Sequence, residues 1–89
     1  MSIPTYTEAR ERLALVSLLV AQIKPVLAGQ PPEIQGAVLA DCLAIWLAGH
    51  YVTGDEDATR TMRAEFLAAH FSLVRQLVPV NAKMMGTTP

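Results

Sequence analysis

The stretch from Ile34 to Gly49, IQGAVLADCLAIWLAG, decides the fold of this chain. Apart from Gln35 and Asp41, its side chains are apolar or are glycine. Placed at 100° per residue, the large side chains cover well over half of the circumference of a helix. The remaining face consists of alanines with Asp41 in its middle. A helix with so little polar surface is typical of one that is buried on more than one side.

Two further helix-like segments flank this stretch. In the first, Leu13, Val16, Val20 and Ile23 recur at spacings of three and four, which is one stripe of a helix. Only a narrow line of small and polar residues lies opposite that stripe. The C-terminal segment has a conventional apolar face that includes His70. We predict three helices and a tail, over residues 6–28, 31–50, 55–78 and 79–89.

Local signals mark the ends of these helices. Thr5 with Glu8, and Thr53 with Glu56, have the spacing of a capping box, in which two side chains satisfy free backbone amides. Proline removes a helical hydrogen bond, so we expect Pro79 to break the third helix. The tail can then form one more helical turn through Met85, stopped by the following glycine.

Composition predicts an associating helical protein. Of the 89 residues, 52% are hydrophobic and 17% are charged, whereas average chains carry roughly a quarter charged residues. We predict that residues 1–89 form a single all-α domain, a three-helix up-down-up bundle with a short C-terminal extension. The apolar surface that three helices do not bury among themselves requires contact with a partner chain, a ligand or a membrane. We expect a homodimer, because two-fold pairing is the commonest solution. A monomer with a lipid-binding or membrane-facing groove is the alternative.

Several classes of function are disfavoured. A net charge of −1 offers no general attraction for nucleic acid. The longest uninterrupted apolar run, residues 42–49, is far shorter than the ~20 residues that span a bilayer. The N-terminal MSIPTYTEARER lacks the order of a signal peptide, and the single cysteine fits a reducing compartment. We therefore expect a cytoplasmic protein.

Asp41 is the residue that breaks the apolar pattern. It can mark an exposed alanine face, or it can pair with a cation. Counting outward from a turn near Val52 places Asp41 level with Arg63 on an antiparallel third helix. An Asp41–Arg63 ion pair is therefore one hypothesis, and a catalytic aspartate is the weakest, since no nucleophile or metal-ligand cluster accompanies it.

His70 lies at the centre of the apolar face of the third helix. We expect a core histidine with one ring nitrogen bonded to a backbone carbonyl or an acid; a metal ligand, a pH switch or a general base are alternatives. Cys42 and His50 are too far apart along one helix to share an ion. We predict no catalytic residue, no metal and no cofactor, and Asp41, Arg63 and His70 are the candidate buried polar or ion-pair residues.

Trp46 is the largest anchor available for an interface, because tryptophan is enriched at interface centres. The candidate interface anchors are Trp46, Cys42, Leu19 and Ile45. We predict a non-enzymatic module that associates with itself and binds another, unknown protein in a regulatory role. The alternative is a small-molecule or lipid-binding bundle with a groove between the first two helices.

Overall fold

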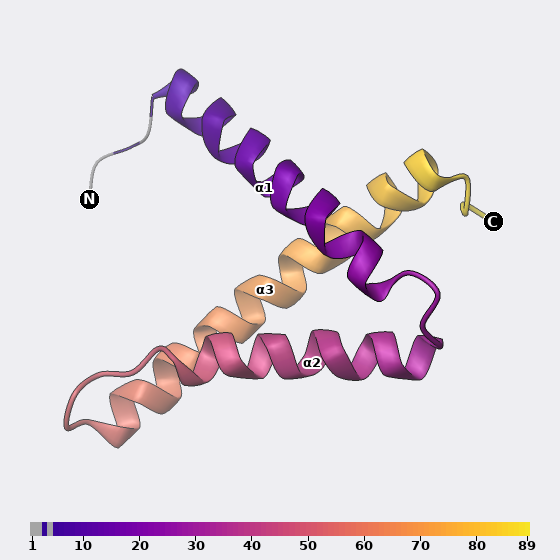
Figure 1. Ribbon diagram of the computed structural model, residues 1–89. Helices are drawn as coiled ribbons and strands as arrows, with labels where there is room; N and C mark the ends of the chain where they lie inside the picture. The colour runs from indigo at the N-terminus through magenta and orange to yellow at the C-terminus, as the bar shows by residue number, and fades with distance from the viewer. Residues whose placement is uncertain (1–2, 4) are drawn as a thin grey trace. The chain divides into compact units, whose positions relative to one another are not determined.

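The computed structural model describes residues 3 and 5–89, whose regular secondary structure is entirely helical, with no strand. Three helices follow one another along the chain: α1 (Tyr6–Leu27), α2 (Pro32–Ala48) and α3 (Glu56–Met85) (Figure 1). The predicted all-α class is therefore confirmed. The first two helices lie within two residues of their predicted bounds, and the third is longer than predicted.

The chain divides into two compact units, Met1–Val38 and Leu39–Pro89, and the division falls inside α2. The first unit contains α1 and the first residues of α2. The second contains the remainder of α2 and the whole of α3. The single-domain organisation of residues 1–89 stays a prediction, and the two units are described in turn.

In the first unit, both ends of α1 are closed by local hydrogen bonds. Thr5 Oγ1 accepts from the Glu8 amide at 3.1 Å, and the Glu8 carboxylate accepts from the Thr5 amide at 3.2 Å. The predicted capping box is therefore confirmed. At the other end, Gln35 Nε2 in α2 donates to the carbonyl oxygen of Leu27 at 2.9 Å. The same carbonyl accepts from the Gln30 amide at 3.2 Å, so the first turn of α2 adds a second donor at the end of α1.

The start of α3 differs from the sequence prediction. Asp55, rather than Thr53, is the N-cap, and its carboxylate accepts from the Ala58 amide at 2.9 Å. Gly54 has φ +74° and turns the chain directly before this cap. The predicted Thr53–Glu56 box was wrong because the helix starts two residues later than that box requires.

The predicted break at Pro79 was also wrong. α3 continues through this proline to Met85 and ends at Gly86, whose φ of +73° and αL conformation close the helix. Proline removes only its own N–H bond. The residues on both sides include good helix formers, among them Leu77, Ala82 and Lys83, and these continue the helix on either side. The predicted stop at Gly86 is confirmed.

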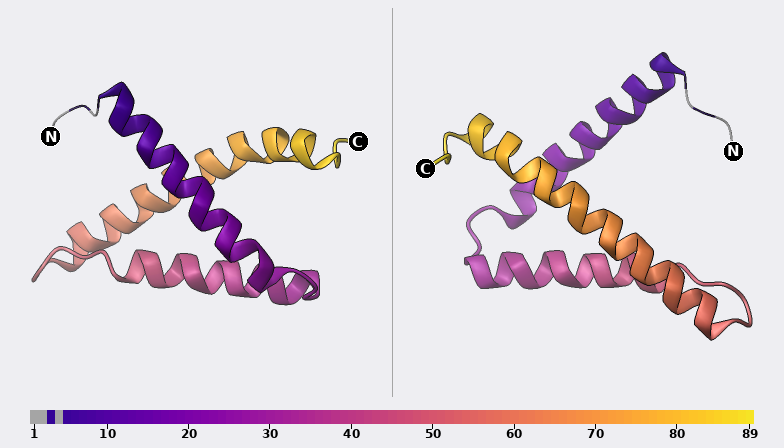
Figure 2. Two further views of the ribbon diagram at one scale, coloured as in Figure 1. Left: turned by 45° about the horizontal axis from the view of Figure 1, so that its top comes forward. Right: turned by 180° about the vertical axis from the view of Figure 1, so that it is seen from behind.

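In the second unit, α2 and α3 form an antiparallel hairpin (Figures 1 and 2). Near the turn, Trp46 contacts Phe66 and His70. Farther from the turn, Leu39 and Val74 line one hollow. Residue numbers on α3 therefore rise as those on α2 fall, as in an antiparallel pair.

The hairpin leaves much of its apolar surface accessible. No residue of the described chain is fully buried. Its best-covered large side chains are half-buried and lie along the seam of the two helices: Leu43, Leu47, Met62, Phe66, Leu67 and His70. Two helices share a single seam, so no side chain can be surrounded on all sides.

The two candidate caps of α3 can be compared directly. Asp55→Ala removes the acceptor for the Ala58 amide and should lower the free energy of unfolding by about 1 kcal/mol. Thr53→Ala removes no cap and should change it by less than ~0.5 kcal/mol. Urea denaturation followed by circular dichroism measures both values. A larger loss in Thr53→Ala would restore the capping box and contradict the assignment of Asp55.

Candidate functional site

Four aromatic rings gather near the turn of the α2–α3 hairpin, and we call them the aromatic cluster: Trp46, His50, Phe66 and His70. Trp46 stacks on Phe66, with centroids 5.8 Å apart and planes at 23°. Its indole also lies 5.8 Å from the His70 ring. His50 contacts Trp46 and Phe66 edge-on, each at 5.3 Å.

The sequence spacing explains why these four rings meet. Trp46 and His50 are four residues apart on α2, and Phe66 and His70 are four apart on α3. Residues at this spacing lie one above the other on one side of a helix. Each helix therefore presents two rings to the other, and such aromatic pairs contribute about 0.5–1.5 kcal/mol each beyond their buried area.

Arg63 closes the C-terminal end of α2. Its Nε donates to the carbonyl oxygens of Leu47 at 3.1 Å and His50 at 3.0 Å, and its Nη2 donates to that of Ala48 at 3.0 Å. Nearby, His50 Nδ1 lies 2.6 Å from the carbonyl oxygen of Trp46. These four carbonyls belong to the last turn of α2 or follow it directly, where the helix provides few donors; among them, that of Leu47 also accepts from the His50 amide at 3.0 Å. A cation there also complements the helix dipole.

The hypothesis of an Asp41–Arg63 ion pair was wrong. Asp41 is exposed, and the only ion pair in the described part of the chain joins Arg60 and Asp57. The connection between the helices explains the error, because it runs beside the first turns of α3. The Val52 amide donates to Thr59 Oγ1 at 2.9 Å. This offset places Arg63 at the end of α2, roughly two turns beyond Asp41.

His70 is half-buried, as a core-facing residue would be. The expected bond from one ring nitrogen to a carbonyl or an acid does not occur for His70 within residues 3 and 5–89. His50 forms such a contact instead. The described residues contain no group of three or more His, Cys, Asp or Glu side chains that could hold a metal ion.

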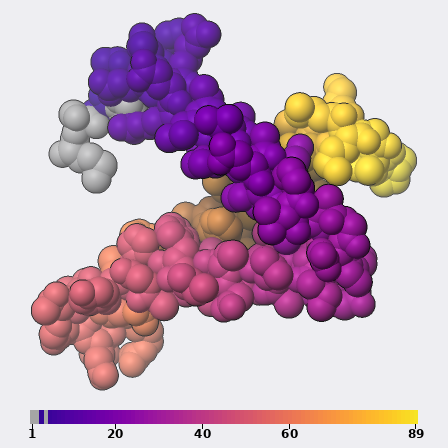
Figure 3. All heavy atoms as spheres, in the orientation of Figure 1, coloured from indigo at the N-terminus to yellow at the C-terminus, as the bar shows by residue number. Residues whose placement is uncertain are grey.

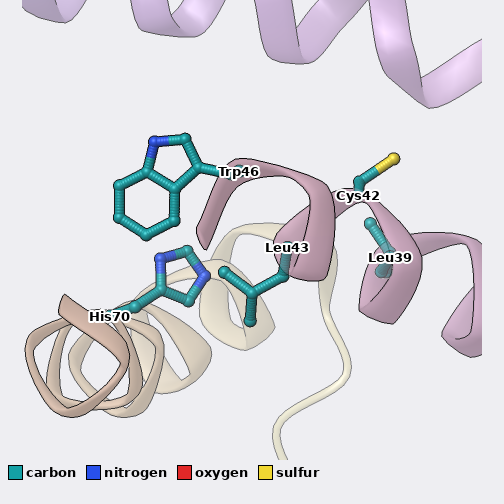
Figure 4. A pocket seen from close by; sticks show the side chains of 5 residues that line it. All are labelled: Leu39, Cys42, Leu43, Trp46 and His70. Carbon is teal, nitrogen blue, oxygen red and sulfur yellow. The ribbon is translucent and has the colours of Figure 1, made fainter. Parts of the chain in front are cut away.

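A hollow with a volume of about 450 Å³ opens beside the aromatic cluster. Its lining comes from both helices of the hairpin: Leu39, Cys42, Leu43, Trp46 and His70 (Figure 4). A second hollow, of about 350 Å³, shares three of these side chains and adds Ala40, Phe71 and Val74. Both are open to solvent, and their linings are mostly apolar.

The structure brings together some of the predicted site residues and separates others. Trp46, Cys42 and His70 line one hollow. Ile45 does not line either of the two hollows, and its side chain is 65% exposed. Leu19 belongs to α1, in the other unit, and is 47% exposed. Phe66, whose ring contacts both Trp46 and His50, was not among the predicted site residues; the i, i+4 aromatic spacing on both helices is the signal that could have found it.

Comparison with known protein families, with curated proteins and with solved structures found no match to this chain. Among the described residues, no helix combines the length and the apolar character that crossing a membrane requires. The site is therefore interpreted from its own geometry.

The role of Arg63 can be tested against a matched arginine on the same helix. Arg63→Met removes the donor to the carbonyls of Ala48 and His50 and one of the two donors to that of Leu47, and should lower the free energy of unfolding by about 1.5–3 kcal/mol. Arg60→Met removes an ion pair whose side chains are 76% and 92% exposed, and should cost less than ~1 kcal/mol. Chemical denaturation gives both values. Equal losses would show that Arg63 does not hold the end of α2.

Proposed function

We propose that this chain acts by protein–protein association, pairing with a second copy of itself rather than catalysing a reaction. The observation that supports this proposal is the apolar character of α2 on every side. Between Leu39 and Ala48, Asp41 is the only charged side chain, and the Trp46 indole and the Cys42 thiol are the only others with a hydrogen-bonding group. Within its unit this part of α2 has one helical neighbour, α3. A helix without a polar face requires neighbours on more than one side.

The side of α2 turned away from α3 is the surface we assign to the second copy. Ile45 is 65% exposed, and Ala44 and Ala48 flank it. In the space-filling view, α2 stands in front of α3 near the hairpin turn and its near side carries no α3 atoms (Figure 3). Small side chains beside a branched one allow two helices to approach closely.

Charge favours a second copy over a strongly charged partner. The net charge of −1 produces little repulsion between copies. Asp41 lies four residues before Ile45 and therefore near the same face. Two Asp41 carboxylates would repel each other at a two-fold axis, so the axis falls nearer Ile45, with Asp41 at the hydrated rim.

The arrangement of all three helices in the paired copies is part of the same proposal. The exposed stripe of α1, which includes Leu13, Val16, Val20 and Ile23, also requires a cover. In the proposed assembly the three helices run up-down-up, and the paired copies also cover the apolar surface of α1, including Leu19. A cytoplasmic location and a regulatory role on a further protein partner extend this proposal.

Replacing Ile45 tests the proposed interface. Ile45→Asp places a charge where the second copy would pack and should weaken dimerisation at least ~10-fold, since burying an unpaired charge costs well over 1.4 kcal/mol. Gln76→Asp adds the same charge at an exposed position of α3 and should leave dimerisation unchanged. Sedimentation velocity at several protein concentrations measures both. A wild-type chain that sediments as a monomer throughout would overturn the proposal.

A further inference from the structure

His70 is a polar side chain with no polar partner at the edge of an apolar hollow. Its imidazole carries one N–H donor and one acceptor nitrogen when neutral. Within residues 3 and 5–89, neither nitrogen forms a hydrogen bond with the protein, and both are accessible to water, since no buried side-chain nitrogen or oxygen of these residues lacks a partner. Figure 4 shows the ring between the Trp46 indole and the Leu43 side chain, facing the hollow that they line. The other histidine of the cluster, His50, contacts the carbonyl oxygen of Trp46.

The walls of this hollow match a flat, mostly apolar molecule. Leu39 and Leu43 provide aliphatic surface, and the Trp46 ring, 42% exposed, provides an aromatic one. The volume of about 450 Å³ falls within the range of small-molecule sites, which combine apolar walls with a few polar groups. Here the His70 imidazole, which has no hydrogen-bond partner in the protein, supplies the polar group among apolar walls.

The charge distribution indicates that the ligand is neutral. Apart from histidine and the Cys42 thiol, the only ionisable side chain in residues 39–48 and 66–74 is Asp41. Asp41 does not line the hollow. A charged ligand would lose its hydration without gaining an opposite charge. The apolar face of a packing helix would fill the hollow but leave His70 unsatisfied, whereas a hydroxylated ring would satisfy it.

We propose that the hollow beside Trp46 binds a neutral planar aromatic molecule with one hydrogen-bonding group, which His70 recognises. The ring packs against Trp46, Leu39 and Leu43, and its hydroxyl exchanges a hydrogen bond with the imidazole. This site differs from the surface assigned to the second copy, and it lies within one chain. Ligand binding and self-association can therefore fail independently.

Two probes that differ only in a hydroxyl group test the proposal: 2-naphthol and naphthalene. Trp46 is the single tryptophan, so its indole N–H gives one cross-peak in a ¹H–¹⁵N spectrum and reports directly on the hollow. Both probes should shift this peak saturably in the full-length chain. 2-Naphthol should bind about 2- to 10-fold more tightly than naphthalene, as one hydrogen bond predicts.

The histidine variants locate that hydrogen bond. His70→Phe keeps a ring of similar shape and should abolish the advantage of 2-naphthol, whereas His50→Phe, the matched change in the same cluster, should retain it. In the wild-type chain, 2-naphthol should also perturb the imidazole ¹⁵N signals of His70 more than those of His50, a readout that needs no variant. The proposal would be overturned if neither probe bound saturably, or if 2-naphthol still bound more tightly than naphthalene in His70→Phe.

Discussion

The structure depends on one constraint: α2 has almost no polar surface and must be covered by other helices. Its segment from Leu39 to Ala48 contains one charged side chain, Asp41, which is exposed. At about 25 cal/mol per Å² of apolar area, each further side of such a helix that becomes covered stabilises the folded chain. α3 covers one side, and the exposed Ile45 lies on the side that we assign to a second copy.

Two kinds of contact decide which side of α2 meets α3. The aromatic cluster sets the register, because Trp46 stacks on Phe66 while His50 contacts the same ring. Arg63 then satisfies the carbonyls at the end of α2, which fixes where that helix stops. The polar contacts at the turn and the apolar seam thus favour one pairing of the helices. The same pairing leaves the hollow beside His70 open.

Local features of this fold were predictable from the sequence, and features that depend on register were not. The Thr5–Glu8 capping box and the Gly86 stop follow from residues a few positions apart. The partner of Arg63 depends on how the connection to α3 runs, and the Val52–Thr59 hydrogen bond that directs it has no signature in the sequence. The break predicted at Pro79 was wrong for a related reason. A proline disfavours a helix locally, but the residues on both sides of Pro79 continue α3 to Met85. The hollow beside Trp46 depends on the same register, so only its individual residues could be anticipated.

The central claim is that α2 is covered by a second copy of the chain. The most direct test is the melting temperature of the wild-type chain over a hundredfold range of protein concentration. A chain stabilised by dimerisation melts at a higher temperature as its concentration rises, because mass action favours the folded dimer. The account predicts this rise. A melting temperature that stays constant over the whole range, in a chain that sediments as a monomer, would contradict it.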